Sequence, residues 1–214
     1  MTANETTGRG AAKAKMRTKA KSERFGEAYY ERYYEDASTR VHDKKRIAHL
    51  ARAVTDMIAW HGGKLANALD VGAGAGLWRD WFAKHQPRTQ YRSIEVSPYA
   101  CAKYGHEQRD ISAWRARDRF DLIVCQGVLQ YIPDEGAAAA IENLGAMSRG
   151  FLYLEAITRA DFDDVCDQSK TDGDVNLRTA AWYRARLGAH FTNLGCGLYY
   201  TRRGPLQFYE LEKA

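Results

Sequence analysis

The segment Ala68-Leu69-Asp70-Val71-Gly72-Ala73-Gly74-Ala75-Gly76 places an acid and three alternating glycines at the end of an apolar run. This pattern is typical of a buried parallel strand that turns sharply into a helix. Glycine suits a loop whose backbone must take positive φ or approach a ligand closely. The free N–H groups at the start of the next helix favour a polar or anionic ligand. We therefore expect a nucleoside-type cofactor at this loop.

Polar side chains also follow the next predicted strands. One strand carries Glu95 near its C-terminal end, 19 residues after Gly76. A carboxylate there can accept hydrogen bonds from both hydroxyls of a ribose. A third strand is followed by Asp110, and a fourth by Gln126. Because ligands of open α/β sheets lie beyond the carboxyl ends of the strands, we expect these side chains to meet in one site.

The pattern Asp70-x-Gly72-x-Gly74-x-Gly76 resembles the first motif of the class I S-adenosylmethionine-dependent methyltransferases. Phe120-Asp121-Leu122-Ile123 resembles the F-D-hydrophobic-hydrophobic motif of that family, and residues 128–134 resemble the segment that follows it. The resemblance covers residues 25 to 201 and implies S-adenosylmethionine as the cofactor. It implies these cofactor contacts: Tyr29, Asp70, Gly72, Ala73, Gly74, Gly76, Glu95, Val96, Asp110, Ile111 and Gln126.

Several of these acids also have a structural interpretation. Asp70 can cap the turn that follows it, and Asp110 can act as the N-cap of the segment that begins at Ile111. Asp121 begins its strand rather than ending it, so a structural role is expected there. The single histidines His106 and His190 are expected to be structural as well.

Four tyrosines lie within six residues near the start of the predicted domain: Tyr29, Tyr30, Tyr33 and Tyr34. They fall at i, i+4 spacing on a helix that is expected to begin near Ser22. Family resemblance implies a leading helix that lies over the cofactor, and tyrosine offers an apolar face with a polar tip. The alternative is that the rings dock the helix onto the core. We favour at least one of them lining the site.

Methyl transfer from a sulfonium is an in-line displacement, and alignment of the acceptor supplies much of the catalysis. A general base is needed only where the acceptor must lose a proton. No Ser/His/Asp or metal-ligand constellation is evident. The catalytic candidates are Glu155, Tyr131 and Tyr33. Glu155 opens an acidic loop, residues 155–178, that holds seven acids and three cations. This loop either recognises a cationic or amine-bearing acceptor or is a solvated surface.

Composition places the chain among globular proteins. It has 214 residues and a net charge of +5. Residues 1–24 hold seven basic and two acidic residues, whereas residues 25–214 hold 25 of each. The basic tail is expected to be disordered, and it either contacts nucleic acid or acidic lipid through phosphates or has no specific partner.

No apolar run approaches the roughly 20 residues of a membrane helix. The four cysteines form no C-x-x-C pair, and a reducing cytoplasm is the expected location.

Helical and strand patterns alternate along the rest of the chain. Helices are predicted over 42–60, 77–84, after Pro98, 135–147 and 180–187, and strands over 66–71, 91–96, near 108, 120–125, 151–154, 191–194 and 198–201. This alternation predicts an α/β, doubly wound, mostly parallel sheet. The last two strands resemble the closing antiparallel strand pair of the methyltransferase family, which implies a Rossmann-like seven-stranded sheet that ends in a C-terminal antiparallel hairpin. A single methyltransferase domain with an N-terminal lid helix is expected over 25–214.

The prediction is thus an S-adenosylmethionine-dependent methyltransferase that acts on an O or N atom of a small molecule. The segment Cys125-Gln126-Gly127-Val128 departs from the N/D-P-P-Y/F signature of nucleic-acid and protein amino-group methyltransferases. An RNA methyltransferase that uses the basic tail is the second choice, and a non-catalytic binding protein the third. An NAD(P)-dependent oxidoreductase is disfavoured, because Leu77 stands where the third dinucleotide glycine would fall. The sequence leaves the oligomeric state open.

Overall fold

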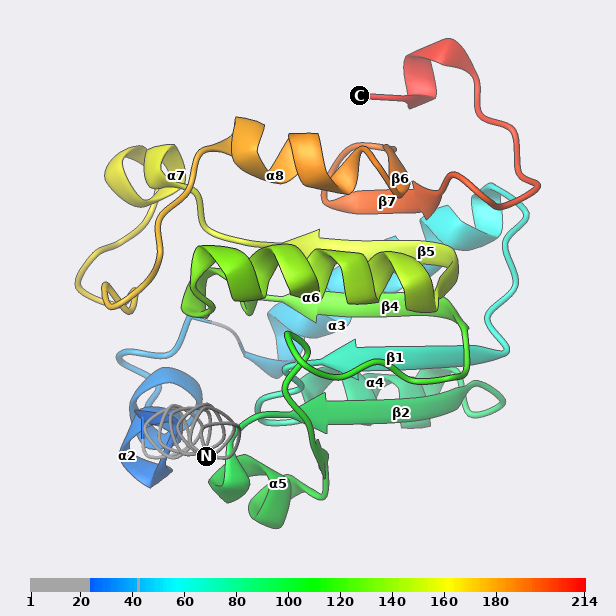
Figure 1. Ribbon diagram of the computed structural model, residues 1–214. Helices are drawn as coiled ribbons and strands as arrows, with labels where there is room; N and C mark the ends of the chain where they lie inside the picture. Colours follow the sequence, from blue (N-terminus) through cyan, green and yellow to red (C-terminus); the bar gives the residue numbers. More distant parts are fainter. Residues whose placement is uncertain (1–23, 42) are drawn as a thin grey trace, which may run out of the picture.

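The computed structural model describes residues 24–41 and 43–214, which build a seven-stranded sheet with helices on both faces (Figure 1). Its strand order is β3-β2-β1-β4-β5-β7-β6. Strands β1 to β5 pair in parallel, whereas β7 is antiparallel to both β5 and β6. The predicted fold class is confirmed. The strands are β1 (Asn67–Val71), β2 (Gln90–Glu95), β3 (Glu107–Gln108), β4 (Phe120–Gln126), β5 (Ser148–Glu155), β6 (Phe191–Asn193) and β7 (Leu198–Thr201).

Side-chain caps define where several helices begin. The Asp43 carboxylate accepts from the Arg46 N–H at the start of α3, and the Ser97 hydroxyl accepts from the Ala100 N–H at the start of α5. Each cap satisfies an N–H group that has no partner inside its helix. The helices are α2 (Glu27–Tyr30), η1 (Glu31–Glu35), α3 (Lys44–Trp60), α4 (Leu77–His85), α5 (Pro98–Tyr104), η2 (Leu129–Tyr131), α6 (Asp134–Met147), α7 (Arg159–Asp164), α8 (Ala180–Leu187) and η3 (Glu210–Glu212).

Two hydrophobic clusters cover the two faces of the sheet. One includes Ile141 and Leu144 of α6, and the other includes Ile58 of α3 and Phe82 of α4. Strands β1 and β4 contribute to both clusters, which is why their sequences are nearly continuous apolar runs. A third, smaller cluster joins Phe25 and Tyr30 to Ala100 of α5. It is through this third cluster that the N-terminal helices dock beside the carboxyl ends of the strands.

The structure refines several boundaries. Strand β5 begins at Ser148, three residues before the predicted start, and the strand near Gln108 has only two residues. Asp121 is structural as predicted, because its carboxylate accepts from the N–H groups of Ala66 and Asn67 and pairs with Arg149. Trp182 of α8 is half-buried and packs against the cluster that includes Ile141 and Leu144.

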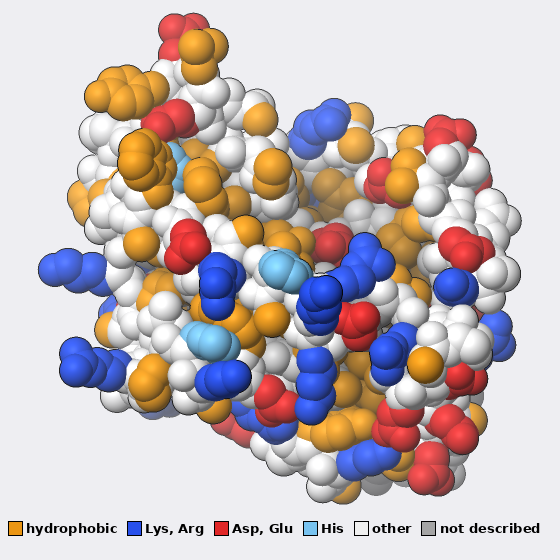
Figure 2. Space-filling model, turned by 180° about the vertical axis from the view of Figure 1, so that it is seen from behind, with side chains coloured by type: hydrophobic (Ala, Val, Ile, Leu, Met, Phe, Trp, Pro, Cys, Tyr) orange, Lys and Arg blue, Asp and Glu red, His pale blue; other side chains and the backbone are white. Residues whose placement is uncertain are grey.

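The predicted basic tail lies outside the described residues except for Arg24. In the described part of the chain, no helix is both long and apolar enough to cross a membrane. Figure 2 shows the molecule from behind, where Lys and Arg side chains are interspersed with Asp and Glu. This mixture agrees with the balanced charge of residues 25–214.

Candidate active site

The glycine loop after β1 has a backbone that other residues could not adopt without strain. Gly72 and Gly74 have φ values of 69° and 56°. A Cβ atom on Gly72 would lie 2.3 Å from the Cγ2 atom of Val128, and one on Gly74 would lie 2.8 Å from the Tyr34 hydroxyl. The glycines are therefore required both by the turn and by the side chains that pack against it.

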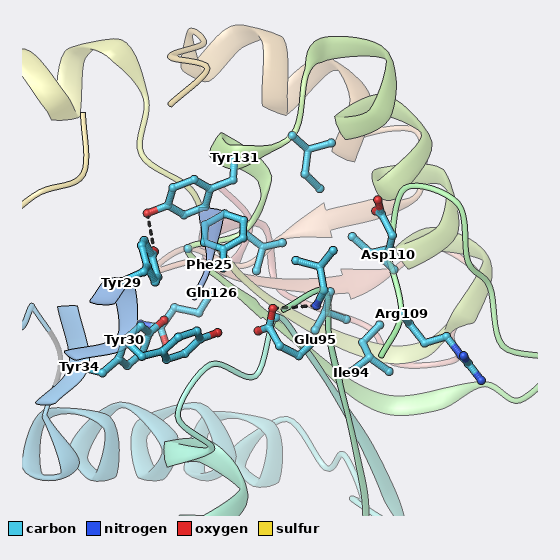
Figure 3. A pocket seen from close by; sticks show the side chains of 17 residues that line it. Phe25, Tyr29, Tyr30, Tyr34, Ile94, Glu95, Arg109, Asp110, Gln126 and Tyr131 are labelled. Atoms are coloured by element: carbon cyan, nitrogen blue, oxygen red, sulfur yellow. Dashed lines mark hydrogen bonds between the residues drawn. The ribbon is translucent and has the colours of Figure 1, made fainter. Parts of the chain in front are cut away.

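Glu95 lies at the end of β2 and faces this loop (Figure 3). Its Oε2 atom accepts from the Gly74 N–H over 3.1 Å, and its Oε1 atom accepts from the N–H groups of Val96 (2.7 Å) and Ser97 (3.0 Å). Burial raises the pKa of Glu95, although these N–H groups and the Tyr30 hydroxyl act in the opposite direction. The carboxylate is thus fixed in orientation beside the glycine loop.

The loop is also supported from the side by a buried histidine. The His106 Nε2 atom lies 3.1 Å from the Gly74 carbonyl oxygen, and its Nδ1 atom lies 2.8 Å from the Ser93 hydroxyl. Burial lowers the pKa of His106, so the neutral ring donates from Nε2 to the carbonyl and accepts at Nδ1. This is the structural role that the sequence predicted.

Asp70 lies at the end of β1, and its partner is a side chain on the neighbouring strand. The Tyr91 hydroxyl donates to its Oδ2 atom over 2.7 Å. Burial raises the pKa of Asp70 to about 7. The carboxylate is buried against Tyr91 and is not among the residues that line the cavity described next.

A cavity lies at the carboxyl ends of β1, β2 and β4, between the strands and the N-terminal helices; we call it the strand-end cavity. Figure 3 shows Tyr30 and Tyr34 near Glu95 and Tyr29 beside Tyr131, whereas the Arg109 side chain extends away from them. Predicted site residues that it brings together are Tyr29, Gly72, Glu95, Val96, Asp110, Ile111, Gln126 and Tyr131. The other predicted ones, Asp70, Ala73, Gly74, Gly76, Tyr33 and Glu155, are not among its lining residues. Further lining residues are Phe25, Tyr30, Tyr34, Val71, Ile94, Arg109, Gly127, Val128 and Ile132.

Asp110 holds a turn, and no helix begins at Ile111. Its Oδ1 atom accepts from the Ser112 N–H over 2.9 Å and from the Ser112 hydroxyl over 2.6 Å. These bonds hold the turn after β3, and the residue also lines the strand-end cavity. The local turn therefore fixes where its carboxyl group sits relative to a ligand.

Gln126 connects the strand-end cavity to Glu155. The Trp78 Nε1–H group donates to the Gln126 Oε1 atom over 2.8 Å, which turns the amide nitrogen toward the Glu155 carboxylate, 3.4 and 3.5 Å away. Glu155 also accepts from the Tyr153 hydroxyl over 3.2 Å and lines a second cavity with Cys196 and Tyr183. Sequence reasoning missed Trp78, because it is 48 residues from Gln126 and carries no motif.

The lid segment, α2 and η1 (Glu27–Glu35), places its tyrosines over the cavity. The Tyr29 hydroxyl donates to the Tyr131 hydroxyl over 3.0 Å. Tyr30 and Tyr34 stack with ring centroids 5.1 Å apart, and Tyr33 packs on Tyr29 at 4.8 Å. The segment ends as a π-helix. Tyr29, Tyr30 and Tyr34 line the strand-end cavity. Because Tyr30 is also part of the third cluster, the same segment packs onto α5 and forms a wall of the cavity.

Several acids of the acidic loop (residues 155–178) interact with their own chain. Asp161 forms a capping box with Thr158 at the start of α7. Asp167 accepts from the Ser169 N–H and hydroxyl groups. These carboxylates therefore shape the loop itself, which leaves Glu155 as the acid of the loop nearest the cavity residue Gln126.

The acidic loop is fastened at its end by a buried arginine. The Arg178 Nε–H group donates to Asp134 over 2.7 Å, and its Nη1 atom donates to the Leu129 carbonyl over 2.9 Å. A further Nη2 bond reaches the Ile132 carbonyl. The last part of the loop is thereby held against η2, which carries Tyr131.

Residues 42–203 match the family described as "Methyltransferase domain". A search of curated protein sequences found none that is significantly similar to the chain. Among solved structures, the N-methyltransferase NodS from Bradyrhizobium japonicum WM9, in complex with S-adenosyl-L-homocysteine, is similar with a TM-score of 0.58 and 18% identity, covering 82% of this chain and 98% of that one.

Two further structures have the same fold. Magnesium protoporphyrin IX methyltransferase (ChlM) from Synechocystis PCC 6803, with bound SAM, gives a TM-score of 0.56 at 17% identity and covers 86% of this chain and 95% of that one. The sugar N-methyltransferase KedS8 from Streptoalloteichus sp ATCC 53650 gives 0.54 at 19% identity and covers 72% and 86%. At these identities the likeness establishes the fold, and the family match covers most of the chain. The chain therefore belongs to the methyltransferase-domain family.

Proposed function

We propose that this protein is an S-adenosylmethionine-dependent methyltransferase that transfers a methyl group to an oxygen or nitrogen atom of a small molecule. The observation that carries the proposal is Glu95, a buried carboxylate held at the end of β2 against a glycine loop of positive φ. A carboxylate can accept about four hydrogen bonds, and Glu95 already interacts with three backbone N–H groups and the Tyr30 hydroxyl, so a ribose hydroxyl would take the place of the Tyr30 hydroxyl.

The residues around the strand-end cavity fit the parts of this cofactor. Gly72 brings bare backbone to the cavity, and Val96 and Ile111 offer apolar contact to an adenine ring. Asp110 lies at the side of the cavity where an adenine amino group would need an acceptor. Gln126 stands at the opposite side, at the end of β4, where the methionine part would lie. We assign Ala73, Gly74 and Gly76 to shaping the loop and Asp70 to supporting it from β1.

The cofactor, when bound, supplies a methyl group that the sulfonium charge has already activated. This chain must then align the acceptor and exclude water. Burial raises the pKa of Tyr131 to about 12 and raises that of Tyr29 further, so both phenols stay protonated near neutral pH. Because Tyr29 donates to Tyr131, the Tyr131 proton is directed to another acceptor. Tyr131 thus acts as a hydrogen-bond donor that orients the methyl acceptor, not as a base.

Glu155 is our candidate for the group that holds the acceptor or takes its proton. Its support is the contact with Gln126, which places the carboxylate one side chain away from the strand-end cavity. Tyr33 packs on Tyr29 behind the cavity, so we assign it to lid packing. Once an acceptor is found, Glu155→Gln tests the role: a loss of about 100-fold in kcat/KM supports it, as expected for general acid–base groups. Unchanged methylation would remove it.

A small-molecule acceptor is favoured over RNA by charge. The residues from 25 to 214 are balanced in charge, and the face in Figure 2 has no continuous basic patch. NodS and KedS8 are described as N-methyltransferases, KedS8 acting on a sugar, and ChlM as acting on a porphyrin. An RNA acceptor would require a contribution from the basic tail.

The decisive experiment is calorimetric titration with S-adenosylmethionine, S-adenosylhomocysteine and NADPH. We expect binding of the two sulfur nucleosides and none of NADPH. Glu95→Ala should abolish that binding, whereas Glu107→Ala, which removes an exposed carboxylate paired with Arg92, should leave it unchanged. Failure of both sulfur nucleosides to bind would overturn the proposal. Binding without turnover in a screen of amines, phenols and short RNAs would favour the non-catalytic alternative.

A further inference from the structure

Two charged features of the sequence, the basic N-terminal segment and the acidic loop, meet in the structure at Arg24. Its Nη2 atom lies 3.1 Å from the Oδ2 atom of Asp172 and 3.1 Å from that of Asp174, and it also donates to the Asp174 carbonyl. The residues of the main pair are 148 positions apart in the sequence. This contact therefore ties the start of the lid to a loop near the other end of the chain.

The same guanidinium also lies against two aromatic rings. Its Cζ atom is 5.1 Å from the ring centroid of Tyr131 and 5.3 Å from that of Phe25, and both rings line the strand-end cavity. A cation at this distance is attracted by the ring quadrupole. Arg24 thus contacts the acidic loop and the edge of the cavity at once.

Burial strengthens the attraction between Arg24 and Asp172 relative to that of an ordinary surface ion pair. The Arg24 side chain is 27% exposed and that of Asp172 is 14% exposed, so solvent screens their attraction less than at an open surface. Asp174 is 86% exposed, and a pair of that kind contributes little. Asp172 is therefore the main partner of Arg24, and the exposed Asp174 is a control residue whose removal should have little effect.

The position of Arg24 relative to the lid makes the contact consequential. Four side chains of the cavity wall, Phe25, Tyr29, Tyr30 and Tyr34, come from residues 25–34, directly after Arg24. The far end of the lid is held by Glu35, which pairs with Lys103 and accepts from Tyr104. A nucleoside cofactor bound in the strand-end cavity would contact this wall on one side and the strand ends on the other, so movement of the lid would widen its exit.

We propose that Arg24 is an electrostatic latch that holds the lid to the acidic loop through Asp172 and thereby slows release of the cofactor. The proposal rests on the proposed function for the identity of the ligand. Opening breaks the ion pair and the contact with the Tyr131 ring, so removing Arg24 should raise the dissociation rate of S-adenosylhomocysteine by about tenfold. The wild-type rate should also rise with ionic strength, because salt screens the pair, and the Arg24→Ala rate should rise less.

The kinetic test measures release of S-adenosylhomocysteine by stopped-flow displacement with excess S-adenosylmethionine. Arg24→Ala and Asp172→Asn should each speed release, Arg24→Lys should have a smaller effect, and Asp174→Asn should have little. The exchange of charges, Arg24→Asp with Asp172→Arg, should restore slow release. Arg92→Ala, which breaks an ion pair on β2 and β3, is the matched control and should not change the rate. Equal rates in wild type and both single variants would overturn the latch.

A second measurement needs no ligand and separates this proposal from the proposed function. Hydrogen–deuterium exchange of the peptide that covers residues 25–35 should be faster in Arg24→Ala and Asp172→Asn than in wild type, and the charge exchange should restore protection. Exchange that does not differ among these proteins would refute the latch even where the nucleosides bind. If exchange of residues 25–35 differs among these proteins as expected but the wild-type protein binds neither nucleoside, the proposed cofactor is wrong, whereas the role of Arg24 in holding the lid is supported.

Discussion

The Tyr29 hydroxyl donates to the Tyr131 hydroxyl over 3.0 Å and so joins the lid to η2, the segment that follows β4. Both rings line the strand-end cavity, and the Phe25 ring packs edge-on against each of them at 4.9 and 5.3 Å. This bond therefore joins the wall of the cavity that the lid forms to the wall that follows the sheet.

The two hydroxyls of that pair should be coupled in their effect on stability. Tyr131→Phe leaves the half-buried Tyr29 hydroxyl without its acceptor and should lower the free energy of unfolding by about 1 to 2 kcal/mol. The double change to phenylalanine should cost less than the sum of the single changes, because no donor is then left unpaired. Urea unfolding of the four proteins measures this coupling, with Tyr209→Phe, an exposed ring, as the control. Additive effects would contradict it.

The glycine loop supplies a prediction with a matched control. Gly74→Ala combines a left-handed φ with a Cβ atom 2.8 Å from the Tyr34 hydroxyl. Gly62→Ala has a similar φ of 77° but meets nothing within 4 Å. Both should lose about 1 kcal/mol of stability from backbone strain. Only Gly74→Ala should also weaken S-adenosylhomocysteine binding, by at least about tenfold. Calorimetry on both variants checks this, and equal affinities would be the opposing result.

Asp70 should make stability depend on pH in a defined direction. Its pKa is raised by burial from 3.8 to about 7, so the folded state binds its proton more tightly than the unfolded state. The stability that this proton confers is present below about pH 4 and is lost as pH rises through 7. Asp70→Asn should therefore gain stability relative to wild type across that interval, by on the order of 4 kcal/mol.

Urea unfolding of wild type and Asp70→Asn between pH 4.5 and 8 measures this difference. Burial lowers the pKa of His106, which adds a contribution of opposite sign, but both proteins share it and it cancels. Parallel stability curves for the two proteins would show that the Asp70 carboxyl titrates near its ordinary pKa.

Arg178 should be the most costly charged side chain to remove. It is 5% exposed, pairs with Asp134 and donates to the carbonyls of Leu129 and Ile132. Arg178→Ala removes the donor to the Ile132 carbonyl and one of two donors to the Leu129 carbonyl, which also accepts from the Ile132 N–H, so the free energy of unfolding should fall by about 3 kcal/mol. Arg149→Ala, which removes a more exposed pair with Asp121, should cost less than about 1 kcal/mol. Chemical denaturation of both variants decides between these expectations.

The sequence alone determined the sheet and the placement of Glu95 in it. An apolar run, a glycine turn and the helix after it are contiguous, so local pattern is sufficient to predict β1, its loop and α4. Glu95 could be placed because an acid at the end of a second parallel strand must lie at the same edge of the sheet as the glycine loop. The antiparallel hairpin was predicted from two short strands around Gly195-Cys196-Gly197, which resemble the closing strand pair of the family.

Only the tertiary structure decided which distant side chains meet. Arg24 reaches Asp172, and Trp78 orients Gln126, across sequence separations of 148 and 48 residues that no local pattern encodes. The partner of Asp70 likewise became Tyr91 rather than a turn N–H group, because parallel pairing of β1 and β2 brings the two strands together. Local propensity acts over a few residues. These contacts instead depend on how whole helices and strands pack against one another, which is determined only when the entire chain folds.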